Sequence, residues 1–225
     1  MRPTVETFIK ELQTVSFFSE LDENSLRTLA EAGVWREYAE GELIILEGEP
    51  AAGLYYLHEG WVKAVKISAG GREQVLAFLE SGSTFNEVGI FGVQVNPVSV
   101  MALEPAGVWL LPRAAVRGLL RRSPDFAEQI LAKMAARLVY LVGLVTDLSL
   151  RPVTARLARL LLEEAADDVL HRPQWYTQSE LAARLGTVSD VVQRALRSLE
   201  KEGVIRVKRR EIEILDRAAL AELAE

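Results

Sequence analysis

The chain contains no cysteine and only two histidines among its 225 residues. Without thiols it cannot form disulfides, thiolate-based zinc sites or cysteine-ligated iron–sulfur clusters. His58 and His171 are too few for a multi-histidine metal site. We therefore expect neither a metal ion nor another cofactor. No paired-carboxylate or nucleophile–base motif stands out either, so the sequence gives no indication of an enzyme.

Long hydrophobic runs are also lacking, although 49% of the residues are hydrophobic. No uninterrupted apolar run approaches the 18 or so residues that span a bilayer, and the N-terminus lacks a basic-then-apolar signal peptide. The sequence therefore predicts a cytoplasmic protein that does not enter a membrane. Its length and apolar content suffice for two domains with sizeable cores.

The net charge of −6 is unevenly distributed along the chain. Residues 1–150 carry 13 basic and 19 acidic side chains, whereas residues 151–225 carry 13 of each. Between Arg184 and Arg210, eight basic side chains accompany only three acidic ones. A basic stretch on an acidic protein is typical of a DNA-binding module, although a solvated helix face would carry similar charges.

A long helix is predicted from Ser123 to Leu148, with Ser123 as its cap and Pro124 in its first turn. Its apolar residues recur at alternating spacings of three and four, which is the pattern of a coiled-coil seam. A helix packed on its own domain would show the same pattern. The position between a β-rich half and a helical half favours a seam between two copies of the chain. The seam residues are Leu131, Met134, Leu138, Leu141, Val145 and Leu148.

The residues before this helix predict a β-rich domain. Short runs rich in β-forming residues alternate with glycine-bearing turns, which indicates an antiparallel barrel or jelly roll. Helices are expected over residues 4–16, 25–32 and 113–121, and a helical turn over 85–91 interrupts the strands. The expected strands cover residues 42–46, 53–57, 60–67, 74–79, 97–102 and 107–111.

The residues after the long helix predict a winged helix-turn-helix. Arg151-Pro152 ends the long helix, and a further helix covers residues 153–166. Two capping boxes, Thr177 to Glu180 and Thr187 to Asp190, open two helices on either side of Gly186. The alternation over 203–215 predicts a two-stranded wing. The inward face of the helix pair is expected to consist of Leu181, Leu185, Val191, Leu196 and Leu199.

The fold is therefore predicted to be α+β, with an N-terminal antiparallel β-barrel or jelly-roll sensor, a long dimerisation helix and a C-terminal winged helix-turn-helix. The corresponding domains are residues 1–122, 123–150 and 151–225. An ordinary helical hairpin could mimic the paired helices alone, but the wing and the basic charge make the combination much more specific for DNA.

Together these motifs resemble the Crp/Fnr superfamily of bacterial transcription regulators, from about Phe17 to Leu215. The C-terminal half carries the more specific part of the resemblance. The matching segments are Gly41-Glu42, Gly48-Glu49, Leu54 to Gly60, Phe85-Asn86-Glu87, the long helix, Thr177 to Gly186 and Arg194 to Ile205. The resemblance implies a homodimer whose recognition helices enter successive major grooves of a pseudo-palindromic site, about 34 Å apart. It also implies double-stranded DNA and RNA polymerase as partners.

The resemblance places base readers near the start of the second capped helix. Arginine can pair with guanine, a carboxylate can accept from cytosine, and glutamine can read adenine. The expected base readers are Ser189, Asp190, Gln193 and Arg194, where Ser189 replaces a basic residue frequent in the family. The expected phosphate contacts are Thr177, Thr187, Arg197, Lys201, Lys208, Arg209 and Arg210.

The sensor departs from the cyclic-nucleotide-binding members of the superfamily. Glu87 matches their ribose-binding glutamate, but Asn86 replaces the preceding glycine, and Asn96-Pro97 replaces the arginine–serine pair that holds the phosphate. Leu141 and Val142 replace two small hydroxyl residues that meet the purine. A phosphate without its arginine loses a charge-assisted hydrogen bond. We therefore expect an effector that is not a typical cyclic nucleotide, or none, with any effector pocket lined by Asn86, Glu87, Asn96, Leu141 and Val142.

Other functions stay open as alternatives. A cAMP-responsive regulator is one, and a ligand-binding signalling module whose C-terminal helices contact a protein is another. A haem sensor would have to use His58, but a single histidine at a turn is more often structural. Whether the protein activates or represses depends on promoter geometry, which the sequence does not encode.

Overall fold

The computed structural model describes residues 2–92 and 94–224, and it divides into two compact units. Unit 1 consists of Met1–Lys66 and Leu76–Val139, and unit 2 of Ile67–Val75 and Tyr140–Glu225. One strand hairpin and the long helix contribute residues to both units. The domain limits at residues 122 and 150 stay a prediction. The division into compact units does not test them, because its boundary falls inside the long helix.

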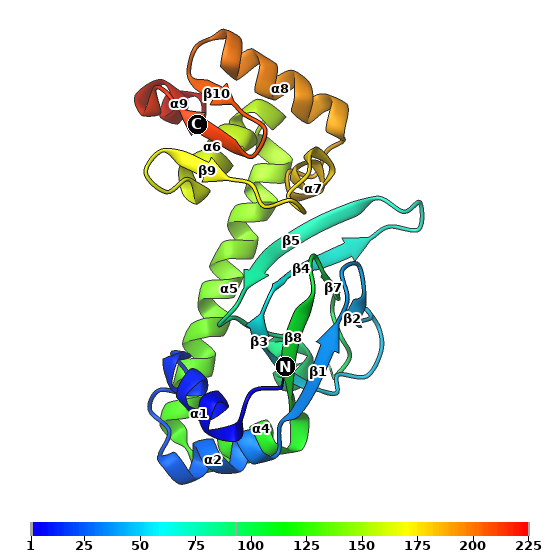
Figure 1. Cartoon of the computed structure of the whole chain (residues 1–225), viewed down its shortest axis with the longest axis vertical. Coiled ribbons are helices and arrows are strands. Elements are labelled where there is room, and N and C mark those ends of the chain that lie inside the picture. The colour runs from blue at the N-terminus through cyan, green and yellow to red at the C-terminus, as the bar shows by residue number, and fades with distance from the viewer. Residues whose placement is uncertain (1, 93, 225) are drawn as a thin grey trace. The chain divides into compact units, whose positions relative to one another are not determined.

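The predicted α+β class is confirmed (Figure 1). The helices are α1 (Val5–Thr14), α2 (Glu23–Glu31), α3 (Glu87–Phe91), α4 (Arg113–Arg122), α5 (Pro124–Leu150), α6 (Val153–Glu164), α7 (Gln178–Arg184), α8 (Ser189–Lys201) and α9 (Arg217–Leu223). The strands are β1 (Val34–Tyr38), β2 (Leu43–Ile45), β3 (Gly53–Glu59), β4 (Trp61–Ile67), β5 (Glu73–Glu80), β6 (Thr84–Phe85), β7 (Ser99–Ala102), β8 (Ala106–Pro112), β9 (Val169–His171), β10 (Ile205–Val207) and β11 (Glu211–Ile214).

The N-terminal strands form two antiparallel four-stranded sheets, in the orders β1-β8-β3-β6 and β2-β7-β4-β5. The predicted barrel alternative is wrong, because the two sheets do not close into a barrel. Apolar side chains from both sheets, including Leu57, Val62 and Val108, are buried in one shared core cluster. This packing of sheet on sheet corresponds to the jelly-roll alternative.

Helices α1, α2 and α4 gather at one end of the sheets in unit 1 (Figure 1). Phe8 of α1 stacks on Trp109 of β8, with ring centroids 4.4 Å apart. The start of α5 joins this core, where Phe126 and Ile130 are almost completely buried. His58, at the end of β3, pairs through Nδ1 with a Glu11 carboxylate oxygen of α1 at 2.9 Å. This contact supports the structural interpretation of His58 over the haem alternative.

Local capping explains where the long helix begins and ends. The Ser123 hydroxyl accepts a hydrogen bond from the Phe126 N–H at 3.2 Å, which confirms the predicted cap. α5 ends at Leu150, and Pro152 is the N-cap residue of α6. The predicted break at Arg151-Pro152 is therefore confirmed, because proline cannot continue the backbone ladder.

Unit 2 contains one three-stranded sheet in the order β10-β11-β9. The two wing strands were predicted from the sequence, but β9 was not. In the structure His171 ends β9 and pairs with Glu211 of β11. Strand β9 is only three residues long, and the chain alone gives no sign of its distant partner. The segments β1, β6 and α9 were likewise not predicted.

Candidate DNA interface and sensor insert

The two helices of the predicted helix-turn-helix are α7 and α8. The Thr177 hydroxyl accepts from the Glu180 N–H at 3.3 Å, which confirms the predicted cap of α7. Gly186 follows with φ of +65°, a left-handed conformation that glycine adopts without strain. The chain then reverses into α8. The predicted helix–turn–helix arrangement is therefore present.

The second predicted capping box is wrong by one residue. The N-cap of α8 is Val188, which has no side-chain capping bond, and the Thr187 N–H instead donates to the Ala182 carbonyl at 2.9 Å. The predicted inward face is also corrected, because Val192 is fully buried while Val191 is half-buried. Adjacent residues of a helix point about 100° apart, so Val192 and not Val191 meets the core.

The polar residues of α8 that were expected to contact DNA lie on its accessible side. Asp190 and Arg194 are exposed and four residues apart, so they share one face of the helix. Ser189, Gln193 and Thr187 are half-buried. Arg197 and Lys201 are exposed further along the helix. Within the part of the chain that the structure describes, no ion pair engages Arg194 or Arg197, so both charges are available to a ligand.

The wing consists of β10, β11 and the turn between them. Arg172 supports the turn, since its guanidinium donates to the Lys208 carbonyl at 2.8 Å. Lys208 Nζ pairs with Glu211 at 2.6 Å and with Glu213 at 3.4 Å. Arg209 and Arg210 are exposed, and no ion pair of theirs occurs among residues 2–92 and 94–224. These two arginines are therefore better placed than Lys208 for phosphate contact.

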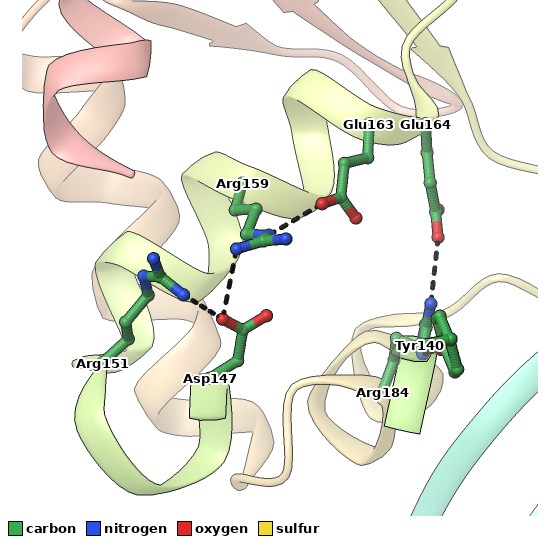
Figure 2. A network of polar contacts seen from close by, with 7 residues as sticks. All are labelled: Tyr140, Asp147, Arg151, Arg159, Glu163, Glu164 and Arg184. Atoms are coloured by element: carbon green, nitrogen blue, oxygen red, sulfur yellow. Dashed lines mark hydrogen bonds and ion pairs between the residues drawn. The ribbon is translucent and has the colours of Figure 1, made fainter. Parts of the chain in front are cut away.

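Two clusters of polar contacts join the second half of α5 to the rest of unit 2 (Figure 2). In the first, Asp147 pairs with Arg151, and Arg159 lies 3.5 Å from the same carboxylate. In the second, Arg184 of α7 donates to the Tyr140 hydroxyl at 2.5 Å and lies 3.8 Å from Glu164. Helix α7 is thus attached to the long helix through an arginine that is mostly buried.

Glu164 also accepts a hydrogen bond from the Tyr176 hydroxyl at 3.1 Å. Burial raises the pKa of the Glu164 carboxyl above its ordinary value, while the Arg184 charge and the Tyr176 hydroxyl act in the opposite direction. The second cluster therefore contains a carboxyl whose ionisation is coupled to folding.

The tip of the β4–β5 hairpin contributes to the turn between α7 and α8. The Arg72 guanidinium donates to the Gly186 carbonyl at 2.6 Å, and the Gln74 amide donates to the Arg184 carbonyl at 3.3 Å. The last carbonyls of a helix lack partners within the helix, so these side chains satisfy groups at the end of α7. These contacts join segments far apart in the chain, so local sequence patterns did not predict them.

In unit 1, the α3 insert carries the residues that match the effector pocket. Asn86 adopts a left-handed conformation, with φ of +74°, directly before α3. Its amide donates to the Gly53 carbonyl at 3.1 Å and to the Asn96 side chain at 3.0 Å. Asn96 is buried and donates to the Leu46 carbonyl at 3.0 Å. Both asparagine side chains are therefore engaged in the chain's own hydrogen bonds.

Glu87 is buried and has its own cationic partner. Lys133 Nζ from α5 lies 2.5 Å from Glu87 Oε1, and the Thr84 hydroxyl donates to the same oxygen at 2.8 Å. Lys133 Nζ also contacts the Thr84 hydroxyl and lies 4.7 Å from the centre of the Phe17 ring. Lys133 was not predicted from the sequence as a partner of Glu87, because nothing in its local sequence distinguishes it from a solvated lysine.

The predicted seam residues of α5 fall into two sets. Leu131, Leu138 and Val145 are exposed by 68%, 64% and 62%. Met134, Leu141 and Leu148 are half-buried, and Met134 packs on the unit 1 core. Val142, expected in the pocket, is 59% exposed. The exposed stripe of α5 therefore runs through Leu131, Ala135, Leu138, Val142 and Val145.

By length and composition α5 could also cross a membrane, since an 18-residue window has a mean hydropathy of 1.4 and is only 6% buried. Among residues 2–92 and 94–224, no group of three or more histidine, aspartate or glutamate side chains is arranged to hold a metal ion.

The chain matches known proteins in both halves. Residues 35–123 match the cyclic nucleotide-binding domain family, and residues 155–223 match the Crp-like helix-turn-helix domain family. The chain is 31% identical over 189 residues to a cyclic AMP receptor protein of Thermus thermophilus, covering 84% of this chain and 87% of that protein. It is 28% identical over 194 residues to a CRP-like cAMP-activated global transcriptional regulator of Mycobacterium tuberculosis, with the same shares covered.

Solved structures show the same fold. FixK2 from Bradyrhizobium japonicum superposes with a TM-score of 0.76 at 24% identity, over 86% of this chain and 98% of that chain. A CRP-family transcriptional regulator from Thermus thermophilus gives a TM-score of 0.65 at 27% identity, over 84% of this chain and 96% of that chain.

The fold, the exposed basic helix and these relatives define a DNA-binding transcription regulator and not an enzyme. The chain belongs to the Crp/Fnr family.

Proposed function

We propose that this regulator is a homodimer that reads a pseudo-palindromic DNA site and does not require a cyclic nucleotide. The observation that carries the proposal is the exposed face of α8, where Asp190 and Arg194 lie four residues apart beside a basic wing. Arginine pairs bidentately with guanine, and a carboxylate accepts from cytosine, so this face has the chemistry of base readout. The exposed Arg209 and Arg210 supply sequence-independent phosphate contacts.

The dimer is supported by the apolar stripe of α5. Leu131, Leu138, Val142 and Val145 each expose more than half of their surface, and together they form a continuous row along the helix. Such a row on a soluble protein favours pairing with an identical row in a symmetric dimer. Two recognition helices related by this symmetry would read half-sites about 34 Å apart.

A dimer seam explains the apolar stripe better than a membrane does. Phe126 and Ile130 of the same helix are buried in the protein core of unit 1, which leaves the start of α5 unavailable to lipid. We further propose that the protein acts in the cytoplasm, where it contacts DNA and RNA polymerase.

The absence of a cyclic nucleotide requirement is supported by the α3 insert. Lys133 already occupies one oxygen of Glu87 with an ion pair in which both partners are charged, whereas a ribose hydroxyl would bring a neutral donor. Asn96 is held by Asn86 and the Leu46 carbonyl, and the Pro97 carbonyl accepts from Lys66 at 3.2 Å. One oxygen of the carboxylate that matches the sugar site, and the groups that match the phosphate site, are therefore engaged within the chain.

A cAMP-responsive regulator is the second candidate. It is favoured by the relatives in Thermus thermophilus and Mycobacterium tuberculosis, whose names refer to cyclic AMP, and by the presence of Glu87. Against it stands the lack of an arginine where the phosphate would bind.

The experiment that tests the proposal is selection of bound duplexes from a random pool, without added nucleotide. We expect an enriched motif with two inverted half-sites about one helical turn apart. The matched control is Arg194→Ala, which should lose enrichment at one base pair of each half-site. No enrichment by the wild type, or a motif without inverted symmetry, would contradict the proposal and favour the signalling-module alternative.

A further inference from the structure

The start of α8 carries two apolar side chains that are not fully buried. Val188, the N-cap residue, is 56% exposed, and Val191 in the first turn is half-buried. The helix does not need either of them for its core, because Val192 is the fully buried valine of this turn. Val188 contributes no side-chain capping bond either. Neither the fold nor the capping of α8 therefore accounts for an exposed valine at position 188.

Backbone hydrogen bonds fix the position of these side chains. The Val188 carbonyl accepts from the N–H groups of Val191 at 3.0 Å and of Val192 at 3.2 Å. Residues 188, 191 and 194 follow one another at a spacing of three, so they form a diagonal row that turns by about 60° around the helix at each step. The row presents two branched apolar groups and then the exposed guanidinium of Arg194.

The charges around this row favour DNA as its occupant. Arg194, Arg197 and Lys201 are exposed on the same helix, and Arg209 and Arg210 on the wing. Positive charge complements phosphate, whereas an apolar protein partner would have to desolvate these cations. In the major groove the apolar feature that base edges offer is the C5 methyl group of thymine.

We propose that Val188, together with Val191, reads the methyl group of a thymine next to the base pair that Arg194 contacts. The inference rests on the proposed function, because it assumes that α8 enters the major groove. It adds a specificity determinant that hydrogen-bond donors and acceptors alone would not supply. Each half-site therefore contains one thymine whose recognition depends on its methyl group.

The test uses the dimeric full-length protein and the duplex obtained by selection. Each thymine is replaced in turn by uracil, which removes the methyl group and keeps every hydrogen-bonding group. Burial of one methyl group favours binding about fourfold, so uracil at the sensitive position should weaken binding about fourfold per half-site and about 15-fold in both. Uracil at other positions should leave the affinity unchanged.

Val188→Ala completes a double-mutant cycle with the uracil duplex. The variant should bind the thymine duplex about as weakly as the wild type binds the uracil duplex, and it should no longer distinguish the two. Its affinity for random DNA and its melting temperature should match the wild type, since the replaced side chain is exposed and caps nothing. Leu215→Ala, which truncates another exposed apolar side chain of unit 2, is the matched control and should keep the full thymine preference.

The outcomes separate this inference from the proposed function. A selected site that tolerates uracil at every position would overturn the inference alone. The same holds if Val188→Ala retains the wild-type preference for thymine. Failure to select any sequence would overturn the inference together with the proposed function.

Discussion

Arg194 and Arg209 are both exposed cations, but their positions assign them different tasks. Arg194 lies on α8 beside Asp190, whereas Arg209 lies in the wing turn. We expect Arg194→Ala to cost about 1–3 kcal/mol per half-site on the preferred duplex and to relax discrimination at one base pair. Affinity for random DNA should change little. Binding measurements on preferred and random duplexes across a salt series would check this.

Arg209→Ala should behave differently in the same measurements. Loss of a phosphate contact weakens binding to every sequence and makes the salt dependence shallower by about one unit in the slope of log K against log salt. Lys208→Ala should have a smaller effect than Arg209→Ala, because Lys208 is already paired with Glu211 and Glu213. Equal loss on both duplexes for Arg194→Ala would show that α8 does not read bases.

Glu164 gives a prediction about pH. Burial raises the pKa of this carboxyl in the folded protein above that in the unfolded chain. Between the two pKa values the folded state binds more protons, so this group's contribution to the free energy of unfolding falls as pH rises. Relative to Glu164→Gln, the wild type should therefore lose stability as pH increases from about 4.5, the ordinary pKa of the group.

Denaturant unfolding of both proteins at several pH values would measure this difference. Glu163→Gln is a suitable control, because the neighbouring Glu163 carboxylate is mostly exposed and pairs with Arg159 at 2.7 Å. A difference between wild type and Glu164→Gln that rises with pH would contradict the prediction.

At the scale of elements, the exposed stripe of α5 gives a prediction about the dimer. Leu138 lies in the middle of the exposed stripe, so Leu138→Arg would place two unpaired charges in the dimer seam. We expect dissociation of the dimer and loss of specific DNA binding, because uncompensated charges in an apolar interface cost several kcal/mol. Analytical ultracentrifugation at micromolar concentration would detect the change in mass.

The matched control is Ala136→Arg, which adds the same charge at another exposed position of α5. Position 136 lies roughly 140° around the helix from the stripe, so the dimer should persist. A wild type that is monomeric at micromolar concentration, or equal dissociation of both variants, would show that the stripe is not the seam.

The elements themselves were largely predictable, because their limits depend on neighbouring residues. Ser123 and Thr177 cap helices, and Pro152 separates α5 from α6, through interactions within four residues. The register of α8 was not predictable in the same way. Thr187 offered a plausible cap, yet its backbone N–H is engaged by Ala182 of the preceding helix. A contact between elements therefore decided where α8 begins.

At the scale of the whole molecule, the prediction concerns cyclic nucleotides. Titration of the wild type with cAMP or cGMP to about millimolar concentration should give no saturable heat, and the affinity for DNA should not change. The physical reason is the missing charge-assisted bond to phosphate, worth about 1.5–3 kcal/mol, or one to two decades in affinity. The cyclic AMP receptor protein of Thermus thermophilus would serve as the parallel control.

Micromolar binding of either nucleotide would contradict this prediction and favour the cAMP-responsive alternative. Two causes could prevent nucleotide binding: the missing arginine and the pairing of Glu87 with Lys133. Lys133→Met separates them, since it removes the cation that occupies Glu87. If the missing arginine dominates, this variant should still bind neither nucleotide. If Lys133 alone blocks the site, the variant should gain saturable binding.

The sequence by itself determined the α+β class, the order of most elements, the helix-turn-helix with its wing, and the polar residues of α8. These features follow from periodicity, capping and turn residues, which act over a few positions. Asp190 and Arg194 could be chosen because their spacing and chemistry are local properties. The same holds for the basic character of the stretch from Arg184 to Arg210.

Only the tertiary structure decided which side chain faces which neighbour. Lys133 pairs with Glu87, and Asn86 donates a hydrogen bond to Asn96. Val192, rather than Val191, is buried in the core. Likewise, Val142 instead of Leu141 lies in the exposed stripe of α5. The reason is that burial and long-range ion pairs depend on how separate elements pack, and local sequence patterns do not encode the rotation of a helix against its partner.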